Sequence, residues 1–511
     1  MINIEIQENN QIAKNTLILY FRMFITLIIS LYTSRVVLKA LGIVDFGIYN
    51  VIGGIVAMFS FFNTAMTSTT QRYIAFSLGK NNQSEQSKIF FNCVLIHFII
   101  AFFFIIFVEL IGMWFINNKL TIPPERFSAA LSVFHCSVLS TFFLINCVPY
   151  NAAIIAHEKM AAYAYISIIE VFFKLAIVLL LPYTPIDRLC SLAILLTIVQ
   201  LITTMIYIIY CRKTFNETQL RFNYDKNIFK EMLSFTGWNL WGGFSNILYT
   251  QGLNILLNIF FGPAINAARG ISVQIQSAVI QFSSNFQTAI NPQIVKTYAN
   301  QEIIKMHSLI FLSSRFTTLL LLILATPFFV DANCILHLWL GEIPEWSSTF
   351  IQIMLCITII DSAANPFMIA SAATGHIRFY QFAIGGTMLL IVPTSYIALK
   401  FGCKPHIVFI IHLFFCICTF VIRLFIVRSL ISFKITDYIK KCLSRIIPAT
   451  TFLLSIVIFN HNIPKENIFQ SFFVIGCATI LTAAICFTFG LSKHEKGIFL
   501  KKLTWKKTCQ K

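Results

Sequence analysis

The sequence predicts an all-α polytopic membrane protein with about 14 transmembrane helices, arranged as two parallel six-helix repeats plus two extra C-terminal helices. Composition is the first observation behind this fold class. Of the 511 residues, 57% are hydrophobic and only 11% are charged, and mean hydropathy is +0.78. Soluble domains carry about 25% charged residues. The composition therefore excludes a cytosolic enzyme, a DNA-binding protein and a disordered scaffold.

Apolar runs long enough to cross a bilayer are the second observation, since a spanning helix needs about 20 mostly apolar residues. We predict spans at 16–34, 47–70, 89–116, 127–148, 161–181, 189–211, 233–261, 267–291, 308–330, 349–373, 379–399, 405–427, 446–460 and 468–490. The predicted organisation is an N-terminal six-helix bundle over 1–211, a cytoplasmic linker over 212–232, a C-terminal six-helix bundle over 233–430, two additional helices over 431–492 and a basic cytoplasmic tail over 493–511.

The distribution of positive charge predicts the orientation. The net charge is +18, which in a soluble protein would suggest a nucleic-acid partner. Here 25 of the 38 Lys and Arg residues lie on the side that holds both termini, and 9 lie on the opposite side. Because Lys and Arg are retained in cytoplasmic loops, we expect both termini in the cytoplasm. The Lys-rich tail, with apolar residues between its lysines, is expected to bind anionic phospholipids.

An internal repeat is the third observation. A shift of 220 residues places Leu41-Gly42 on Phe261-Gly262, and Pro149 falls near Pro366 at a shift of 217. Six spans separate the copies, so both copies would have the same topology. The repeats would then be parallel, related by an axis along the membrane normal, as in two-lobed transporters.

Two segments resemble a known family. Leu41-Gly-Ile-Val-Asp-Phe-Gly-Ile-Tyr-Asn50 and Asn63-Thr-Ala-Met-Thr-Ser-Thr-Thr-Gln-Arg72 are similar to the start of bacterial polysaccharide-export flippases. These are the O-antigen and capsule transporters of the multidrug/oligosaccharidyl-lipid/polysaccharide exporter (MOP) superfamily. The resemblance implies two helical bundles around a central cavity. It also implies a function, the movement of an undecaprenyl-diphosphate-linked oligosaccharide from the inner to the outer leaflet of the cytoplasmic membrane.

Charged residues within the predicted spans are candidate functional residues, because a charge in the bilayer is costly. Asp361 lies mid-span with no basic residue within a helical turn, and it is the best candidate for a carboxylate that couples transport to an ion such as a proton or sodium. Glu170 and Lys174 lie on one helical face, so they form either a neutralised structural pair or a second coupling site.

Three arginines within spans are candidates for the substrate path, because a cation in the cavity would attract a diphosphate or an acidic sugar. They are Arg22, Arg315 and Arg423. Each also lies near a predicted cytoplasmic end, so the alternative interpretation is a side chain that extends to the headgroups.

The predicted spans over 233–261 and 267–291 are rich in amides. An amide offers both a donor and an acceptor, which suits sugar hydroxyls. It also suits hydrogen bonds between helices, so both interpretations stay open. The candidates for the substrate path are Asn239, Asn246, Gln251, Asn254, Gln274, Gln281 and Asn285. Of these, Gln274, Gln281 and Asn285 share one face of a helix.

Two other functions compete with the flippase. A drug/cation antiporter of the same superfamily should have several carboxylates in its cavity, whereas the charges in these spans are mixed and slightly basic. A membrane-bound polysaccharide-modifying enzyme would need a large extracytoplasmic loop or an acid/base cluster, and the sequence has neither. We therefore expect a transporter that is not an enzyme, that needs no metal or cofactor, and that associates with polysaccharide polymerase machinery.

Overall fold

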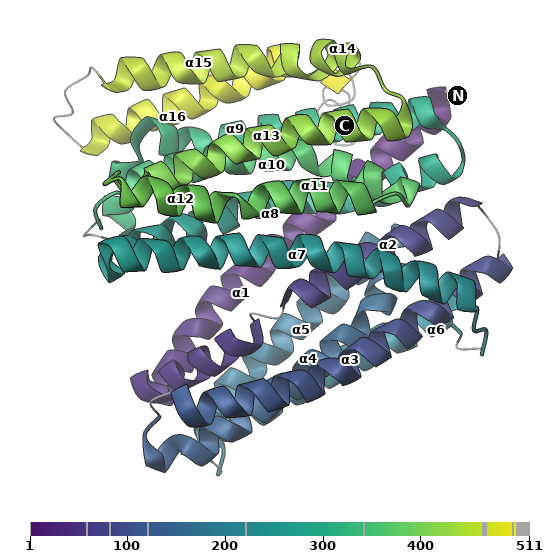
Figure 1. The fold of residues 1–511 in the computed structure, drawn as a ribbon, viewed down its shortest axis with the longest axis vertical. Coiled ribbons are helices and arrows are strands. Elements are labelled where there is room, and N and C mark those ends of the chain that lie inside the picture. Colours follow the sequence, from purple (N-terminus) through teal and green to yellow (C-terminus); the bar gives the residue numbers. More distant parts are fainter. Residues whose placement is uncertain are drawn as a thin grey trace, which may run out of the picture. The chain divides into compact units, whose positions relative to one another are not determined.

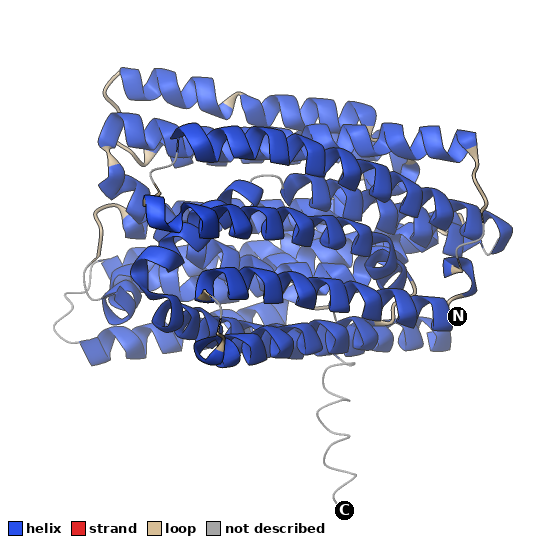
Figure 2. Cartoon of the chain, turned by 90° about the horizontal axis from the view of Figure 1, so that it is seen from below, coloured by secondary structure: helices blue, strands red, loops and turns tan. Residues whose placement is uncertain are grey.

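A computed structural model of the chain describes residues 2–57, 60–80, 83–119, 122–185, 187–219, 222–340, 343–461, 468–492 and 495–496. Within these ranges every regular element is a helix, as Figure 2 shows. The all-α fold class is confirmed. The basic tail predicted over 493–511 lies almost entirely outside the described residues.

The chain divides into two compact units, and the first comprises Met1–Ile247 and Val295–Glu302. Its elements are α1 (Ile2–Ala57), α2 (Ser60–Lys80), α3 (Gln83–Lys119), η1 (Pro124–Arg126), α4 (Phe127–Ala156), α5 (Met160–Leu180), η2 (Leu181–Tyr183), α6 (Arg188–Thr214), η3 (Asn216–Thr218) and the first part of α7 (Lys226–Phe261). Figure 1 shows the helices of this unit, and α4 packs against both α3 and α6.

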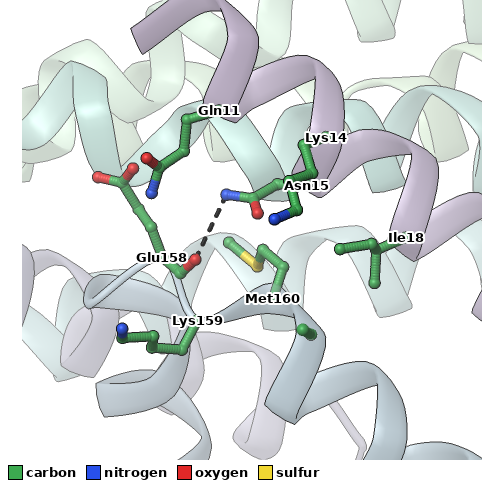
Figure 3. Close-up of a pocket in the computed structure, with 8 residues that line it drawn as sticks. Gln11, Lys14, Asn15, Ile18, Glu158, Lys159 and Met160 are labelled. Atoms are coloured by element: carbon green, nitrogen blue, oxygen red, sulfur yellow. Dashed lines mark hydrogen bonds between the residues drawn. The ribbon is translucent and has the colours of Figure 1, made fainter. Parts of the chain in front are cut away.

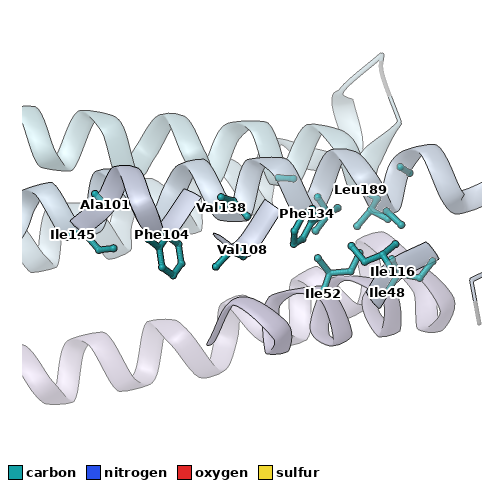
Figure 4. Close-up of a cluster of buried hydrophobic side chains, with 14 of the residues drawn as sticks. Ile48, Ile52, Ala101, Phe104, Val108, Ile116, Phe134, Val138, Ile145 and Leu189 are labelled. Atoms are coloured by element: carbon teal, nitrogen blue, oxygen red, sulfur yellow. The ribbon is translucent and has the colours of Figure 1, made fainter. Parts of the chain in front are cut away.

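A buried cluster of aliphatic and aromatic side chains holds α1, α3, α4 and α6 together (Figure 4). Ile52 and Phe134 are fully buried in this cluster. A Cβ atom at Gly112 would lie 2.3 Å from the Phe134 ring, so α3 and α4 approach more closely there than any other residue at 112 would allow. Apolar contacts therefore pack this cluster of the first unit tightly.

The second unit comprises Leu248–Ile294 and Ile303–Lys511. Its elements are the rest of α7, most of α8 (Pro263–Ala299), α9 (Ile303–Leu340), α10 (Ser347–Thr374), α11 (Arg378–Leu389), α12 (Ile391–Lys400), α13 (Ile407–Ile431), α14 (Ile435–Tyr438), η4 (Ile439–Leu443), α15 (Ser444–His461), α16 (Ile468–Ile485) and η5 (Cys486–Gly490). Phe350 of α10 and Phe409 of α13 are fully buried with ring centroids 4.5 Å apart. The predicted additional helices, α15 and α16, pack on α9.

The two glycines matched by the 220-residue shift have the same positive φ angle. Gly42 interrupts α1 and Gly262 separates α7 from α8, and each has φ 78°. Only glycine adopts this left-handed conformation at little cost. The match agrees with the predicted repeat, which stays a prediction.

Eleven helical segments of the described chain are long and apolar enough to cross a membrane. The other predicted spans, at 47–70, 233–261 and 267–291, fall on α1 with α2, on α7 and on α8, which are helical but more polar. Large apolar side chains are exposed, with Leu110 at 70% and Ile259 at 69%. A surface of this kind is covered by lipid, so the chain is a multi-pass membrane protein. The count of 14 spans stays a prediction.

Candidate functional site

One face of α8 carries exposed polar side chains. Gln274, Ser277, Gln281 and Ser284 follow one another at three- or four-residue intervals, and all four are exposed. This spacing places them on a single face over three turns. We call these four residues the polar stripe. Asn285, which the sequence placed with Gln274 and Gln281, is instead buried.

A second set of α8 amides faces the protein. Gln276 Nε2 donates to Thr358 Oγ1 of α10 at 2.8 Å. Gln287 Nε2 donates to the Ser362 carbonyl at 2.9 Å, and its Oε1 accepts from Asn365 Nδ2 at 2.9 Å. These amides hold α8 against α10. The same helix thus uses amides for packing on one face and exposes them on another.

The amides of α7 divide in the same way. Asn239 is buried and donates to Thr69 Oγ1 of α2 at 3.0 Å, so it joins two helices of the first unit. Asn246 is exposed. Gln251 is also exposed and accepts a 3.0 Å hydrogen bond from Asn254 Nδ2. Gln251 and Asn254 are three residues apart and share a face.

Asp361 has a basic partner from a distant part of the sequence. Its Oδ1 lies 3.7 Å from Nη1 of Arg423 on α13, and Cys416 Sγ donates to the same oxygen at 3.5 Å. Asp361 therefore has a basic neighbour, although no basic residue lies within a helical turn of it on α10. The structure brings together two candidates that the sequence assigned to different roles.

Arg269 is a further buried cation of the second unit, and the sequence analysis missed it. It is 6% exposed, and its Nη2 donates to the Thr250 carbonyl at 2.8 Å. No carboxylate pairs with it among the described residues. Arg269 is the seventh residue of α8 and the third residue of the predicted span over 267–291, so the sequence places it at the end of a span, and only its burial reveals it as a candidate.

Buried polar groups surround these charges. The His412 and Tyr249 rings are 5.1 Å apart, and both residues interact electrostatically with Asp361 and Arg269. His412 Nε2 is buried without a hydrogen-bond partner among the described residues. With one carboxylate and two guanidinium groups, the cluster is cationic overall. Such a cluster suits an anion, or a proton shared with Asp361.

The candidates of the first unit have partners within that unit. The Arg22 guanidinium lies 4.6 Å from the Tyr163 ring centroid of α5, a cation–π contact. Lys174 Nζ donates to Glu170 Oε1 at 2.5 Å, so the predicted pair forms. In the second unit, Arg315 is 7% exposed and contacts the Glu495 carboxylate and the Lys441 carbonyl.

The turn between α4 and α5 forms a separate cluster of charges. The His157 ring stacks on Phe215 with centroids 4.0 Å apart, and His157 Nε2 contacts the Glu217 carboxylate. Burial raises the pKa of the Glu217 carboxyl, but the hydrogen bonds from His157 and from a backbone amide outweigh it, so the pKa falls below its usual value. The next residue, Glu158, is joined to Lys296 Nζ at 2.8 Å.

Comparison with solved structures shows which proteins share this fold. A MATE transporter in complex with MaL6 has a TM-score of 0.70 at 13% identity, over 83% of this chain and 96% of that chain. An outward-facing multidrug resistance MATE family transporter of the MOP superfamily gives 0.68 at 12% identity, with the same coverage. A MOP superfamily transporter from Pyrococcus furiosus Vc1, whose title reports a binding pocket of reverse polarity and suggests a different function, gives 0.68 at 13% identity, again over 83% and 96%.

At these identities the likeness shows the fold, and the sequence comparison shows the family. None of the curated proteins compared with the chain matches it. A family described as polysaccharide biosynthesis protein matches residues 12–298, more than half of the chain. The resemblance seen in the sequence is confirmed: this protein belongs to the polysaccharide biosynthesis protein family and has the fold of MOP-superfamily transporters.

Proposed function

We propose that the protein is a flippase for an undecaprenyl-diphosphate-linked oligosaccharide. It would carry this substrate from the inner to the outer leaflet of the bacterial cytoplasmic membrane by alternating access, with both termini in the cytoplasm. The family supports a role in polysaccharide synthesis, and the fold supports transport. The product would supply an O-antigen or capsule polymerase.

The polar stripe of α8 is the observation that carries this proposal. Amides and hydroxyls facing hydrocarbon leave their hydrogen bonds unsatisfied, at a cost of about 2 kcal/mol or more each. Ser284 Oγ donates to the Gln281 carbonyl at 3.1 Å. The cost therefore falls on the exposed side chains of Gln274, Ser277 and Gln281, which favour a water-filled path over lipid contact. A sugar hydroxyl both donates and accepts hydrogen bonds, and the exposed amides of Gln274 and Gln281 offer both an acceptor and a donor.

The charges of the second unit favour an anionic substrate over a cationic drug. Asp361 is opposed by Arg423 and accompanied by Arg269, so this cluster has a net positive charge. A site that binds a cationic drug would need a net negative charge instead. The arginines would attract a diphosphate, and Asp361 would be the coupling group for a proton or sodium.

The test replaces Gln274 and Gln281 together by Leu, in a strain that lacks the chromosomal copy. We expect normal membrane insertion, because Leu is favourable in lipid, and at least about a tenfold loss of surface polysaccharide. Lipid-linked oligosaccharide should accumulate in the inner leaflet, which lectin access to the outer leaflet would measure.

The matched control uses the amides that pack against α10. Gln276→Leu with Gln287→Leu removes hydrogen bonds between helices, so the amount of folded protein should fall. Export per folded molecule should remain. Full surface polysaccharide in the Gln274→Leu/Gln281→Leu variant would remove the polar stripe from the path and overturn the proposal.

A further inference from the structure

A cavity of about 520 Å³ lies in the first unit, where the start of α1 meets the turn between α4 and α5. Figure 3 shows that its side chains come from both segments. The lining residues are Gln11, Lys14, Asn15, Ile18, Glu158, Lys159, Met160 and Ala161. The volume falls within the roughly 300–1,000 Å³ of small-molecule sites. Five of the eight lining residues have polar or charged side chains, which distinguishes this cavity from a void in the apolar core.

The balance of charge in this cavity is positive. Lys14 and Lys159 both line it, and the one carboxylate is that of Glu158. Glu158 Oε1 accepts a hydrogen bond from Lys296 Nζ at 2.8 Å, so a third lysine already offsets its charge. The Glu158 carbonyl accepts a hydrogen bond from Asn15 Nδ2 at 3.3 Å, drawn as the dashed line in Figure 3. Lys14 and Lys159 remain as the cations available to a ligand.

The start of α5 adds positive potential to the same place. Met160 and Ala161 line the cavity and form the first turn of α5, and the Lys159 side chain does not cap it. The first N–H groups of a helix have no partner within the helix, and the helix dipole is positive at this end. Two lysines, amide donors and a helix start form a combination that binds phosphate.

We propose that this cavity binds the diphosphate headgroup of the substrate lipid at the predicted cytoplasmic surface, before translocation. The inference rests on the proposed flippase function, and it adds a substrate-docking site to it. Two positive charges match a group that carries two phosphates. Arg22 lies on the same face of α1 as Lys14 and Ile18, at four-residue intervals. A headgroup released from the cavity would therefore meet the next cation two turns further into the membrane.

The test measures binding of farnesyl diphosphate, a soluble analogue of the lipid carrier, to the full-length protein in phosphatidylcholine nanodiscs. The variant Lys14→Gln/Lys159→Gln keeps a polar side chain at each position, one atom shorter, and removes both charges. We expect its affinity to fall by roughly a hundredfold, since two charged donors are removed and a hydrogen bond from each contributes about tenfold. The control is Lys226→Gln/Lys230→Gln, two exposed lysines at the start of α7, which should leave the affinity within about twofold.

Competition separates the possible sources of phosphate. Inorganic diphosphate should displace farnesyl diphosphate from the parent protein, whereas farnesol should not. Phosphatidylglycerol in the nanodisc should compete weakly. Equal displacement by phosphatidylglycerol would identify a site for bulk anionic lipid and overturn the proposal. Unchanged affinity in Lys14→Gln/Lys159→Gln would overturn it as well, provided that the variant unfolds at the same temperature as the parent.

A failure of this proposal is distinguishable from a failure of the flippase function. If the cavity is not the docking site, binding is unchanged by the lysine substitutions while deletion of the gene still abolishes surface polysaccharide. If the flippase function is wrong, deletion leaves surface polysaccharide normal. In that case a docking site for the substrate lipid is overturned too, even where farnesyl diphosphate binds through Lys14 and Lys159.

Discussion

The two compact units place their charges differently. In the first unit, Glu170 and Lys174 are one turn apart on α5 and form a direct ion pair at 2.5 Å. In the second unit, Asp361 of α10 finds its partner on α13, where Arg423 lies 3.7 Å away. Arg269 adds a further cation in that unit without a carboxylate among the described residues.

The difference matters because a charge at the bilayer centre costs about 2.5–3.5 kcal/mol during insertion. A pair on one helix inserts as a nearly neutral unit. A pair formed between two helices reaches neutrality only after the bundle has assembled, so each helix bears the cost of its own charge first. Charges kept despite this cost point to function, whereas a local pair is explained by structure alone.

The largest expected effect is that of Asp361→Asn. If Asp361 couples transport to an ion, this variant abolishes polysaccharide export while its membrane level stays near normal. A double variant, Asp361→Asn/Arg423→Gln, separates coupling from charge pairing, because it removes Arg423 together with the carboxylate that faces it. We expect the double variant to be inactive too, measured as surface polysaccharide per folded protein.

Two outcomes would contradict the coupling role. Export restored in the double variant would show that Asp361 serves only to neutralise Arg423. Loss of the protein from the membrane in both variants would show a packing role. Glu109→Gln is the matched control, because Glu109 is also a carboxylate in a predicted span, but its partner on the neighbouring helix, His135 Nδ1 at 3.0 Å, is an imidazole that can be neutral rather than a permanently charged guanidinium. Export should be near normal in this variant.

A smaller effect is expected at Glu217, outside the spans of the first unit. Its folded-state pKa lies below the usual 4.5, so its contact with His157 stabilises the fold above that pH. This stability is lost as the pH falls through the lowered pKa. We expect Glu217→Gln to cost about 1 kcal/mol at pH 7 and progressively less as the pH falls below 4.5.

Thermal unfolding in detergent would measure this effect as the difference between the parent and Glu217→Gln at several pH values. Taking the difference removes the contributions of other titrating groups. A difference that stays constant from pH 7 to pH 3 would contradict the assignment. If the difference in unfolding temperature shrinks as the pH falls, the Glu217 carboxylate stabilises the fold through a contact with a near neighbour. Glu170 and Lys174 are expected to act in the same way.

The sequence predicts the helices well because hydrophobic length is a property of one segment. Apolar runs locate α3 to α6, α9 to α13, α15 and α16 without any knowledge of packing. The Glu170–Lys174 pair is equally local, since four-residue spacing brings the two side chains together on any helix. The resemblance likewise rests on short continuous motifs, and the family match agrees with it.

The candidate site is less predictable because it depends on how each helix is rotated in its bundle. Helical periodicity predicts that Gln274, Gln281 and Asn285 share one face of α8, yet the first two are exposed and the third is buried. The Asp361–Arg423 pair requires α10 and α13 to be neighbours. The cavity beside Lys14 requires α1 to meet the α4–α5 turn. Contacts of this kind join segments that are far apart in the chain, so they cannot be inferred from a single sequence.

The smallest expected effect is that of neutralising the local pair, Glu170→Gln/Lys174→Gln. If the pair is structural, the double variant should insert, fold and export as the parent does, because two opposite charges are removed together. The single variant Lys174→Gln leaves Glu170 without its partner in a membrane-spanning helix, so it should lower the amount of folded protein, with a cost of up to about 3 kcal/mol. Immunoblotting of membranes would measure the level, and surface polysaccharide would measure export. Loss of export in the double variant at normal protein level would give the first unit a functional charge site, and the contrast between the two units would then fail. Normal export in the double variant, together with no export in Asp361→Asn/Arg423→Gln, would assign coupling to the pair that the fold assembles rather than to the pair that a single helix provides.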